Sequence, residues 1–133
     1  MAKQRPPRHN RHAMRAALRR LHSPDVRDLN AWTPHGHDFS ILVQLLVGPD
    51  GDVGEESFDI TLCTPGWLAD QVYKYGILDA RHHLVVDSYD YDRIETYLRN
   101  RVSELNESSW EKLAAKLGRL GRWEFEDYRG PTR

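Results

Sequence analysis

Residues 39–63 read FSILVQLLVGPDGDVGEESFDITLC, and this stretch decides the fold of the chain. From Phe39 to Val47 the residues are mostly apolar and partly β-branched on both faces, which predicts a central strand. Gly48-Pro49-Asp50-Gly51 is typical of a tight turn. From Ser57 to Cys63 apolar and polar residues alternate, which predicts a strand with one buried face and one exposed face. We therefore expect a β-hairpin.

Three helices are predicted after this hairpin: one over residues 65–76, one over residues 90–105, and one that begins at residue 108 and ends at Gly118 or Gly121. Thr64 is the expected N-cap of the first helix, and Gly76 is expected to end it. Asp90 is the expected N-cap of the second helix, which carries apolar residues at 3.6-residue spacing. Ser108 and Glu111 have the spacing of a capping box at the start of the third helix.

The remaining segments give weaker patterns. We expect a strand at His82–Asp87 and a final half-buried strand at Arg122–Tyr128. Val26–Trp32 could make one short helical turn. Residues 13–21 have helical propensities but no amphipathic face at either the helical or the strand period, so their structure stays open.

Together these patterns predict an α+β fold with a mainly antiparallel sheet of about four or five strands packed with two to three helices. The expected order is roughly β-β-β-α-β-α-α-β. A length of 133 residues, with 39% hydrophobic residues, fits one folded domain. We expect residues 14–133 to form this domain and residues 1–13 to be a flexible basic tail.

Charge is distributed unevenly along the chain. Residues 1–20 contain seven lysines and arginines and no acid, whereas residues 21–133 contain 12 basic and 20 acidic residues, a formal charge of minus eight. An acidic body repels nucleic acid and attracts a basic protein partner. We therefore expect no nucleic-acid binding by the domain; an arginine-rich tail that touches nucleic acid is the weaker alternative.

The sequence predicts a cytoplasmic protein that does not bind a membrane. Cys63 is the single cysteine, so no intrachain disulfide is expected. No apolar run approaches the roughly 20 residues of a membrane span, and the basic N-terminus lacks the apolar segment of a secretory signal.

One alternative function is a small metal-dependent hydrolase. His35, His37 and Asp38 could ligate a transition metal, with His82 or His83 as a further ligand. The first three residues stand in a loop interrupted by proline and glycine, where solvated side chains are the commoner finding. For this reason we expect no catalytic residues, no metal, no other cofactor and no small-molecule substrate.

Carboxylates interspersed with aromatic residues are the more informative feature. Aromatic side chains supply buried area in an interface, while acids steer and pair with a basic partner. On this reasoning we expect the partner-binding residues to be Glu55, Glu56, Asp59, Asp87, Tyr89, Asp90, Asp92, Glu124 and Glu126.

Five short motifs carry a resemblance to a known family, over roughly Arg15 to Tyr128. They are Leu21-His22-Ser23-Pro24-Asp25, Gly54-Glu55-Glu56-Ser57-Phe58-Asp59, Cys63-Thr64-Pro65-x-Trp67-Leu68, Arg81-His82-x-Leu84-x-Val86 with Tyr89-Asp90-Tyr91-Asp92-Arg93-Ile94-Glu95, and Gly121-Arg122-Trp123-Glu124-Phe125-Glu126-Asp127-Tyr128. In their letters and order they are similar to the bacterial immunity protein 8 family.

The resemblance implies a cytoplasmic, non-enzymatic immunity protein that binds a cognate polymorphic toxin and neutralises it by occlusion. A basic nuclease is one candidate target, because acidic side chains would occupy a groove that otherwise holds phosphates. The oligomeric state and the identity of the toxin do not follow from the sequence.

Overall fold

The structure is a computed structural model that describes residues 13–125. Its elements, in chain order, are β1 (Met14–His22), β2 (Ser40–Pro49), β3 (Glu56–Cys63), α2 (Pro65–Tyr75), β4 (His83–Val85), α3 (Tyr91–Ser103), β5 (Asn106–Glu107), α4 (Trp110–Leu117) and β6 (Arg122–Trp123). The predicted α+β class and element order are confirmed, with β5 as an addition between the second and third helices.

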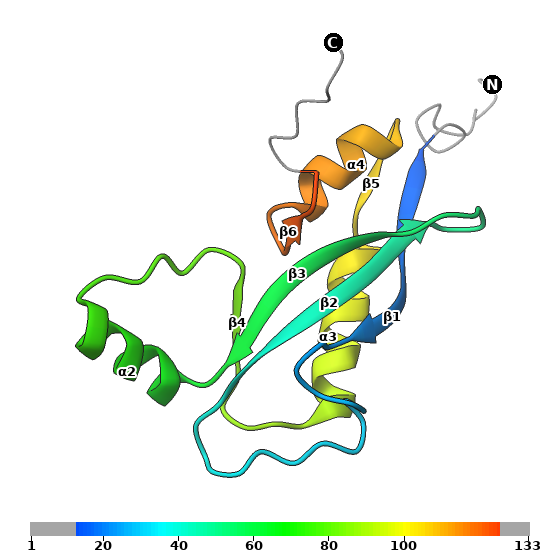
Figure 1. Cartoon of the computed structure of the whole chain (residues 1–133). Coiled ribbons are helices and arrows are strands. Elements are labelled where there is room, and N and C mark those ends of the chain that lie inside the picture. The colour runs from blue at the N-terminus through cyan, green and yellow to red at the C-terminus, as the bar shows by residue number, and fades with distance from the viewer. Residues whose placement is uncertain (1–12, 126–133) are drawn as a thin grey trace, which may run out of the picture.

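The strands form one curled sheet in the order β4-β3-β2-β1-β5, and β6 also pairs with β3 (Figure 1). β1, β2 and β3 are antiparallel neighbours, as the hairpin pattern predicts. β4 is parallel to β3. The reason is that the chain passes through α2 before it returns to the sheet, which is the usual route between parallel strands.

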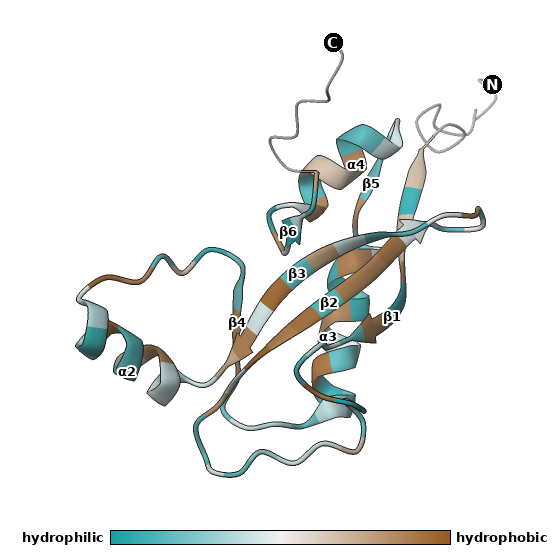
Figure 2. Ribbon diagram, viewed as in Figure 1, coloured by the Kyte–Doolittle hydropathy of each residue, from teal (hydrophilic) through white to brown (hydrophobic). Residues whose placement is uncertain are grey.

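One face of the sheet holds the core. The seven alternate side chains that β2 and β3 contribute to it are at most 5% exposed; they are Ile41, Val43, Leu45, Val47, Phe58, Ile60 and Leu62. Helices α3 and α4 cover this face with fully buried residues, among them Leu98, Val102, Leu113 and Leu117. Figure 2 shows β2 as a nearly continuous apolar strand. Its opposite face, at Leu42, Gln44 and Leu46, is half-buried.

The N-terminal segment that the sequence pattern left unassigned is a strand, and a β-bulge explains why its pattern is hard to interpret. The register of β1 against β2 shifts between Leu18 and Arg20, so the core face changes from even-numbered to odd-numbered residues. The bulged residue, Arg19, donates hydrogen bonds to the carbonyl oxygens of Pro49 (2.7 Å) and Asp52 (2.5 Å). The bulge thus removes the period of two and ties β1 to the β2–β3 turn.

Thr64 joins the start of β2 to the start of α2. It is fully buried, its hydroxyl accepts from the Phe39 N–H at 3.1 Å, and the same hydroxyl donates to Asp38 Oδ1 at 2.9 Å. Thr64 therefore stands at the N-cap position of α2 without capping the helix through its side chain. A Cβ on Gly66 would lie 2.2 Å from the Asp38 carboxylate, so a larger residue there would displace this carboxylate from its present position. The predicted end of the helix at Gly76 is confirmed by its left-handed backbone, with φ 82°.

Three local predictions were wrong. Residues 26–32 form turns and no helical turn, because the Asp28 carboxylate accepts from the Asn30 N–H and closes a tight turn. The N-cap of α4 is Ser109, one residue later than predicted, because the Ser109 hydroxyl is the one that accepts from the Lys112 N–H. The last strand ends at Trp123, where the chain turns and Phe125 packs edge-to-face on the indole; residues 126–128 of the predicted strand lie outside the described part.

The hydrogen bonds of the Thr64 hydroxyl to the Phe39 N–H and to Asp38 lead to a prediction about stability. Thr64→Val keeps the shape of the side chain but leaves the buried Phe39 N–H without its acceptor. We expect the free energy of unfolding, measured by urea denaturation, to fall by about 1–3 kcal/mol. Thr61→Val, on the half-buried outer face of β3, is the matched control and should change it by less than about 0.5 kcal/mol. Equal effects of the two substitutions would contradict the claim that the Thr64 hydroxyl stabilises the fold.

Candidate functional site

The loop histidines do not form a metal site with their neighbours. His35 and His37 are exposed, and the carboxylate of Asp38 accepts from Thr64 Oγ1. Over residues 13–125 no three histidine, cysteine, aspartate or glutamate side chains lie close enough together to hold a metal ion. The metal-hydrolase alternative therefore finds no support in the described structure.

His82 and His83 have separate structural roles. His82 adopts a left-handed backbone, with φ 64°, and its Nε2 lies 2.7 Å from the Gly118 carbonyl at the end of α4. His83 lies on the outer face of the sheet, with its ring 6.2 Å from that of Trp67. The first histidine thus links the turn before β4 to α4, and the second helps to position α2.

Cys63 is fully buried at the end of β3. Burial raises the pKa of its thiol, so the reactive thiolate is disfavoured. Its place just before α2 therefore does not give it the lowered pKa that a nearby helix N-terminus can produce. The residue packs as a structural cysteine.

The predicted partner-binding residues fall into two groups at opposite ends of β3. The β3-start group consists of Glu55, Glu56, Asp59 and Glu124, and the β4–α3 loop group consists of Asp87, Tyr89, Asp90 and Asp92. Glu126 lies outside the described residues. The eight described residues do not share one face, so the predicted contact must be assigned to one group or the other.

In the β3-start group, Glu56 has a clear internal role. Its carboxylate accepts from Trp110 Nε1 at 2.6 Å and also from Trp123 Nε1. One side chain thus connects β3 to α4 and to β6. These bonds occupy both carboxylate oxygens on partly buried indoles, which leaves Glu56 less suited to a partner than its neighbour Glu55 is.

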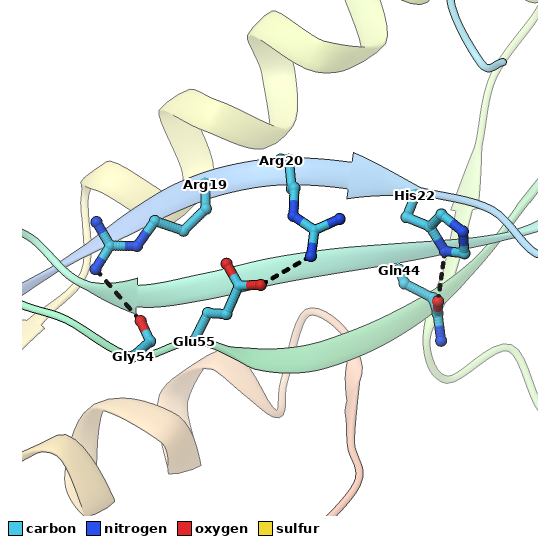
Figure 3. Close-up of polar contacts among 6 residues, drawn as sticks. All are labelled: Arg19, Arg20, His22, Gln44, Gly54 and Glu55. Carbon is cyan, nitrogen blue, oxygen red and sulfur yellow. Dashed lines mark hydrogen bonds and ion pairs between the residues drawn. The ribbon is translucent and has the colours of Figure 1, made fainter.

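Glu55 and Asp59 lie on the outer face of the sheet. Figure 3 shows Arg20 of β1 reaching across β2 to Glu55, and the two charges are 3.0 Å apart. Asp59 Oδ1 accepts from Ser57 Oγ at 2.7 Å. Both partners of the ion pair are exposed enough to be well solvated, so the pair adds little stability. This face is polar, and its charges are of both signs.

In the β4–α3 loop group, Tyr89 belongs to the fold. Its hydroxyl donates to the Leu29 carbonyl at 2.5 Å, and its ring packs edge-to-face on Trp32 and Phe39. Burial, helped by Tyr91 and Asp28, raises the pKa of Tyr89 to about 12. The ring therefore fixes the loop before α3 and leaves the neighbouring carboxylates at the surface.

The three carboxylates of this loop remain exposed. Asp87 pairs with Arg93, and this contact lowers the pKa of Asp87. Asp90 caps α3 by accepting from the Arg93 N–H at 3.2 Å, as predicted. Asp92 lies exposed in the first turn of α3. The pKa of Tyr91 is raised, mainly by its burial and then by Glu95, while Arg99 opposes the shift.

Two exposed apolar features were not among the predicted site residues. Helix α2 buries none of its residues and stands apart from the sheet (Figure 1), and four side chains on it and just after it are strongly exposed: Val72, Tyr73, Tyr75 and Ile77. The sequence predicts the apolar face of this helix but contains no signal that the face stays uncovered.

The second feature is a groove of about 340 Å³ between β4 and α3. It is lined by Leu84, Val85, Val86, Asp87, Arg93, Ile94 and Tyr97. The sequence pattern assigns these residues to a strand and to the apolar face of a helix. That the two elements leave space between them depends on tertiary packing, which the periodicity does not contain.

The family model of Immunity protein 8 matches residues 16–128, a span that begins within β1 and extends beyond β6. Neither the curated proteins nor the solved structures contain a match to this chain. No helix in the described residues has the length and apolar character needed to cross a membrane.

Substitutions at Glu56 and Glu55 compare the stability contribution of an internal contact with that of a surface ion pair. Glu56→Gln replaces one acceptor oxygen with an amide donor, so one indole N–H loses its partner. We expect the free energy of unfolding to fall by about 1–3 kcal/mol, followed by tryptophan fluorescence. Glu55→Gln should cost less than about 1 kcal/mol, because its ion pair is solvated. A Glu56→Gln protein as stable as wild type would show that the two indole contacts contribute nothing.

Tyr89 predicts how stability depends on alkaline pH. Its pKa is about 12 in the folded chain and about 10 when unfolded, so the folded state holds the proton more tightly. This contribution is complete below pH 10 and is lost as the pH rises from 10 to 12. Tyr89→Phe should lower the melting temperature at pH 8 and lose less on going to pH 11 than wild type does. Parallel melting curves for the two proteins would contradict this assignment.

Proposed function

Because the chain belongs to the Immunity protein 8 family, we propose that it binds a cognate bacterial toxin and neutralises it by occlusion, without enzymatic activity. The observation that carries the proposal is the family match over residues 16–128. The protein would act in the cytoplasm of the cell that makes the toxin. A toxin with a basic surface, such as a nuclease, suits the charge of the chain best.

The charge of the described residues supports a basic partner. Residues 13–125 contain 18 aspartates and glutamates against 13 lysines and arginines. Acidic surfaces accelerate encounter with a basic protein and fix its orientation, especially at low salt. Occlusion of a nuclease needs no chemistry from the immunity protein, since its side chains compete directly with substrate phosphates.

Of the two groups of predicted residues, the β4–α3 loop group is better placed to meet such a partner. Asp87, Asp90 and Asp92 are exposed within one short segment. One acid of each group is paired, Glu55 with Arg20 and Asp87 with Arg93, but at the start of β3 Glu56 is also held by two indoles. We therefore assign the electrostatic contact to the loop.

The test is protection from the toxin encoded beside this chain, by co-expression and by measured association rates. Wild type should protect the cells. Asp90→Ser with Asp92→Lys raises the net charge by three units and keeps a side chain that can cap α3. We expect association to slow by about tenfold or more at low salt, and less at high salt.

The matched control makes the same charge change at the other end of β3. Glu55→Gln with Glu124→Lys should slow association much less than the loop pair. Cell death with the wild-type chain present would overturn the proposed function. A larger loss from the control pair would place the contact at the start of β3.

A further inference from the structure

The outer edge of β4 has hydrogen-bonding groups directed away from the sheet. On the inner side, the His82 carbonyl accepts from the Thr61 N–H at 2.9 Å and the Val86 N–H donates to the Cys63 carbonyl at 2.8 Å. Backbone groups alternate between the two sides of a strand, so the N–H and C=O of Val85 point outward. Over residues 13–125 the sheet places no strand beyond β4.

At the opposite edge of the sheet, backbone groups are bonded to other parts of the chain. β5 pairs with the start of β1, the Ala16 N–H donates to the Leu105 carbonyl at 3.1 Å, and Arg99 Nη1 donates to the Leu18 carbonyl at 2.8 Å. Proteins usually cover or interrupt such edges, because an open edge can pair with another chain. The open backbone at β4 is therefore a feature of one side of this sheet.

The apolar groove runs directly beside this open edge. Leu84, Val86 and Ile94 line it from the core side, while Val85 and Tyr97 are each 45% exposed. A volume of about 340 Å³ lies at the low end of the roughly 300–1,000 Å³ of ligand pockets. The groove therefore has room for apolar side chains that project from a segment lying along β4.

Charge at the rim favours a basic segment. Asp87 lies at the end of β4 with its side chain 76% exposed, and it pairs with Arg93 across the groove. Asp90 and Asp92 follow in the same loop. A lysine or arginine on the incoming segment would meet this acidic end and could share the Asp87 carboxylate.

We propose that the groove between β4 and α3 binds an extended, basic segment of the toxin, which adds to β4 as a further strand. Its backbone pairs with Val85, an apolar side chain enters the groove, and a basic residue lies near Asp87. The proposal rests on the toxin-binding function proposed above and names the surface that performs it. An added strand fits because outward N–H and C=O groups pair with extended backbone, whereas the corresponding groups of a helix are already bonded internally.

The backbone part of the proposal is tested with Val85→Pro in the full chain. Proline removes the outward N–H and leaves the β4 bonds to β3 in place, since proline is tolerated on an open edge. We expect binding to the neighbouring toxin, measured by calorimetry, to weaken by about tenfold or more. Val85→Thr, which keeps both the N–H and the branched shape, is the matched control and should bind within about threefold of wild type.

The side-chain part is tested with Tyr97→Ala, which removes a partly exposed wall of the groove. Its control is Tyr73→Ala on α2, where the ring is 91% exposed. We expect Tyr97→Ala to weaken toxin binding by about tenfold or more and Tyr73→Ala to leave it nearly unchanged. Circular dichroism of each variant shows whether it folds. If Val85→Pro does not fold, Tyr97→Ala still tests the proposal.

The outcomes separate the two proposals. A wild-type chain that does not bind the toxin overturns the proposed function, and the groove proposal with it. If wild type binds the toxin and both groove variants bind it as tightly as wild type does, the groove proposal is wrong while the proposed function stands. If only Tyr73→Ala weakens toxin binding, the contact lies on α2 and the groove proposal is wrong. Groove variants that change self-association but leave toxin binding intact would identify a second copy of this chain as the occupant.

Discussion

The pairing of β2 with β3 is the interaction on which the rest of the structure depends. Its register sets Val43 opposite Ile60 and Leu45 opposite Phe58, so the large apolar side chains of both strands share one face. That face must be covered, and α3 and α4 cover it. Because the opposite face is largely polar, α2 has no core to complete, which explains why it can stand away from the sheet with every residue at least partly exposed.

The edges of the sheet follow from the same arrangement. β3 is paired on its second side by β6 near Phe58 and by β4 near Leu62. The Glu56 carboxylate holds β6 and α4 together at one end through two indoles. At the other end, within residues 13–125, β3 is the one strand that pairs with β4, and the chain passes directly into the acidic loop before α3. An open edge, an apolar groove and an acidic rim thus meet at one end of the molecule because of how the strands are ordered.

Local signals in the sequence account for most of the fold. Turn residues, strand alternation and N-cap residues such as Asp90 predict the hairpin and the helices, since each signal acts within a few residues of its element. β1 could not be assigned, because the bulge at Arg19 breaks the alternation and depends on pairing with β2. β5 could not be assigned either, because two residues have no period and become a strand by pairing with β1.

The candidate site was less accessible to sequence reasoning. Composition predicts an acidic surface, but it does not distinguish Glu55, which is exposed, from Glu56, whose indole partners lie 54 and 67 residues away. Tyr89 was predicted to meet a partner, whereas its hydroxyl and ring are engaged within the fold. The groove beside β4 depends on the distance between a strand and a helix, and no local pattern records that distance.

Hydrogen–deuterium exchange of the full chain, alone and bound to the toxin encoded beside it, tests the central claim most directly. The Val85 amide points away from the sheet in the free protein and should exchange quickly there. If the toxin adds a strand to β4, protection should appear at Val85 and extend along the first two turns of α3. Protection confined to α2 or to the start of β3, with Val85 exchanging as fast as in the free chain, would contradict the account.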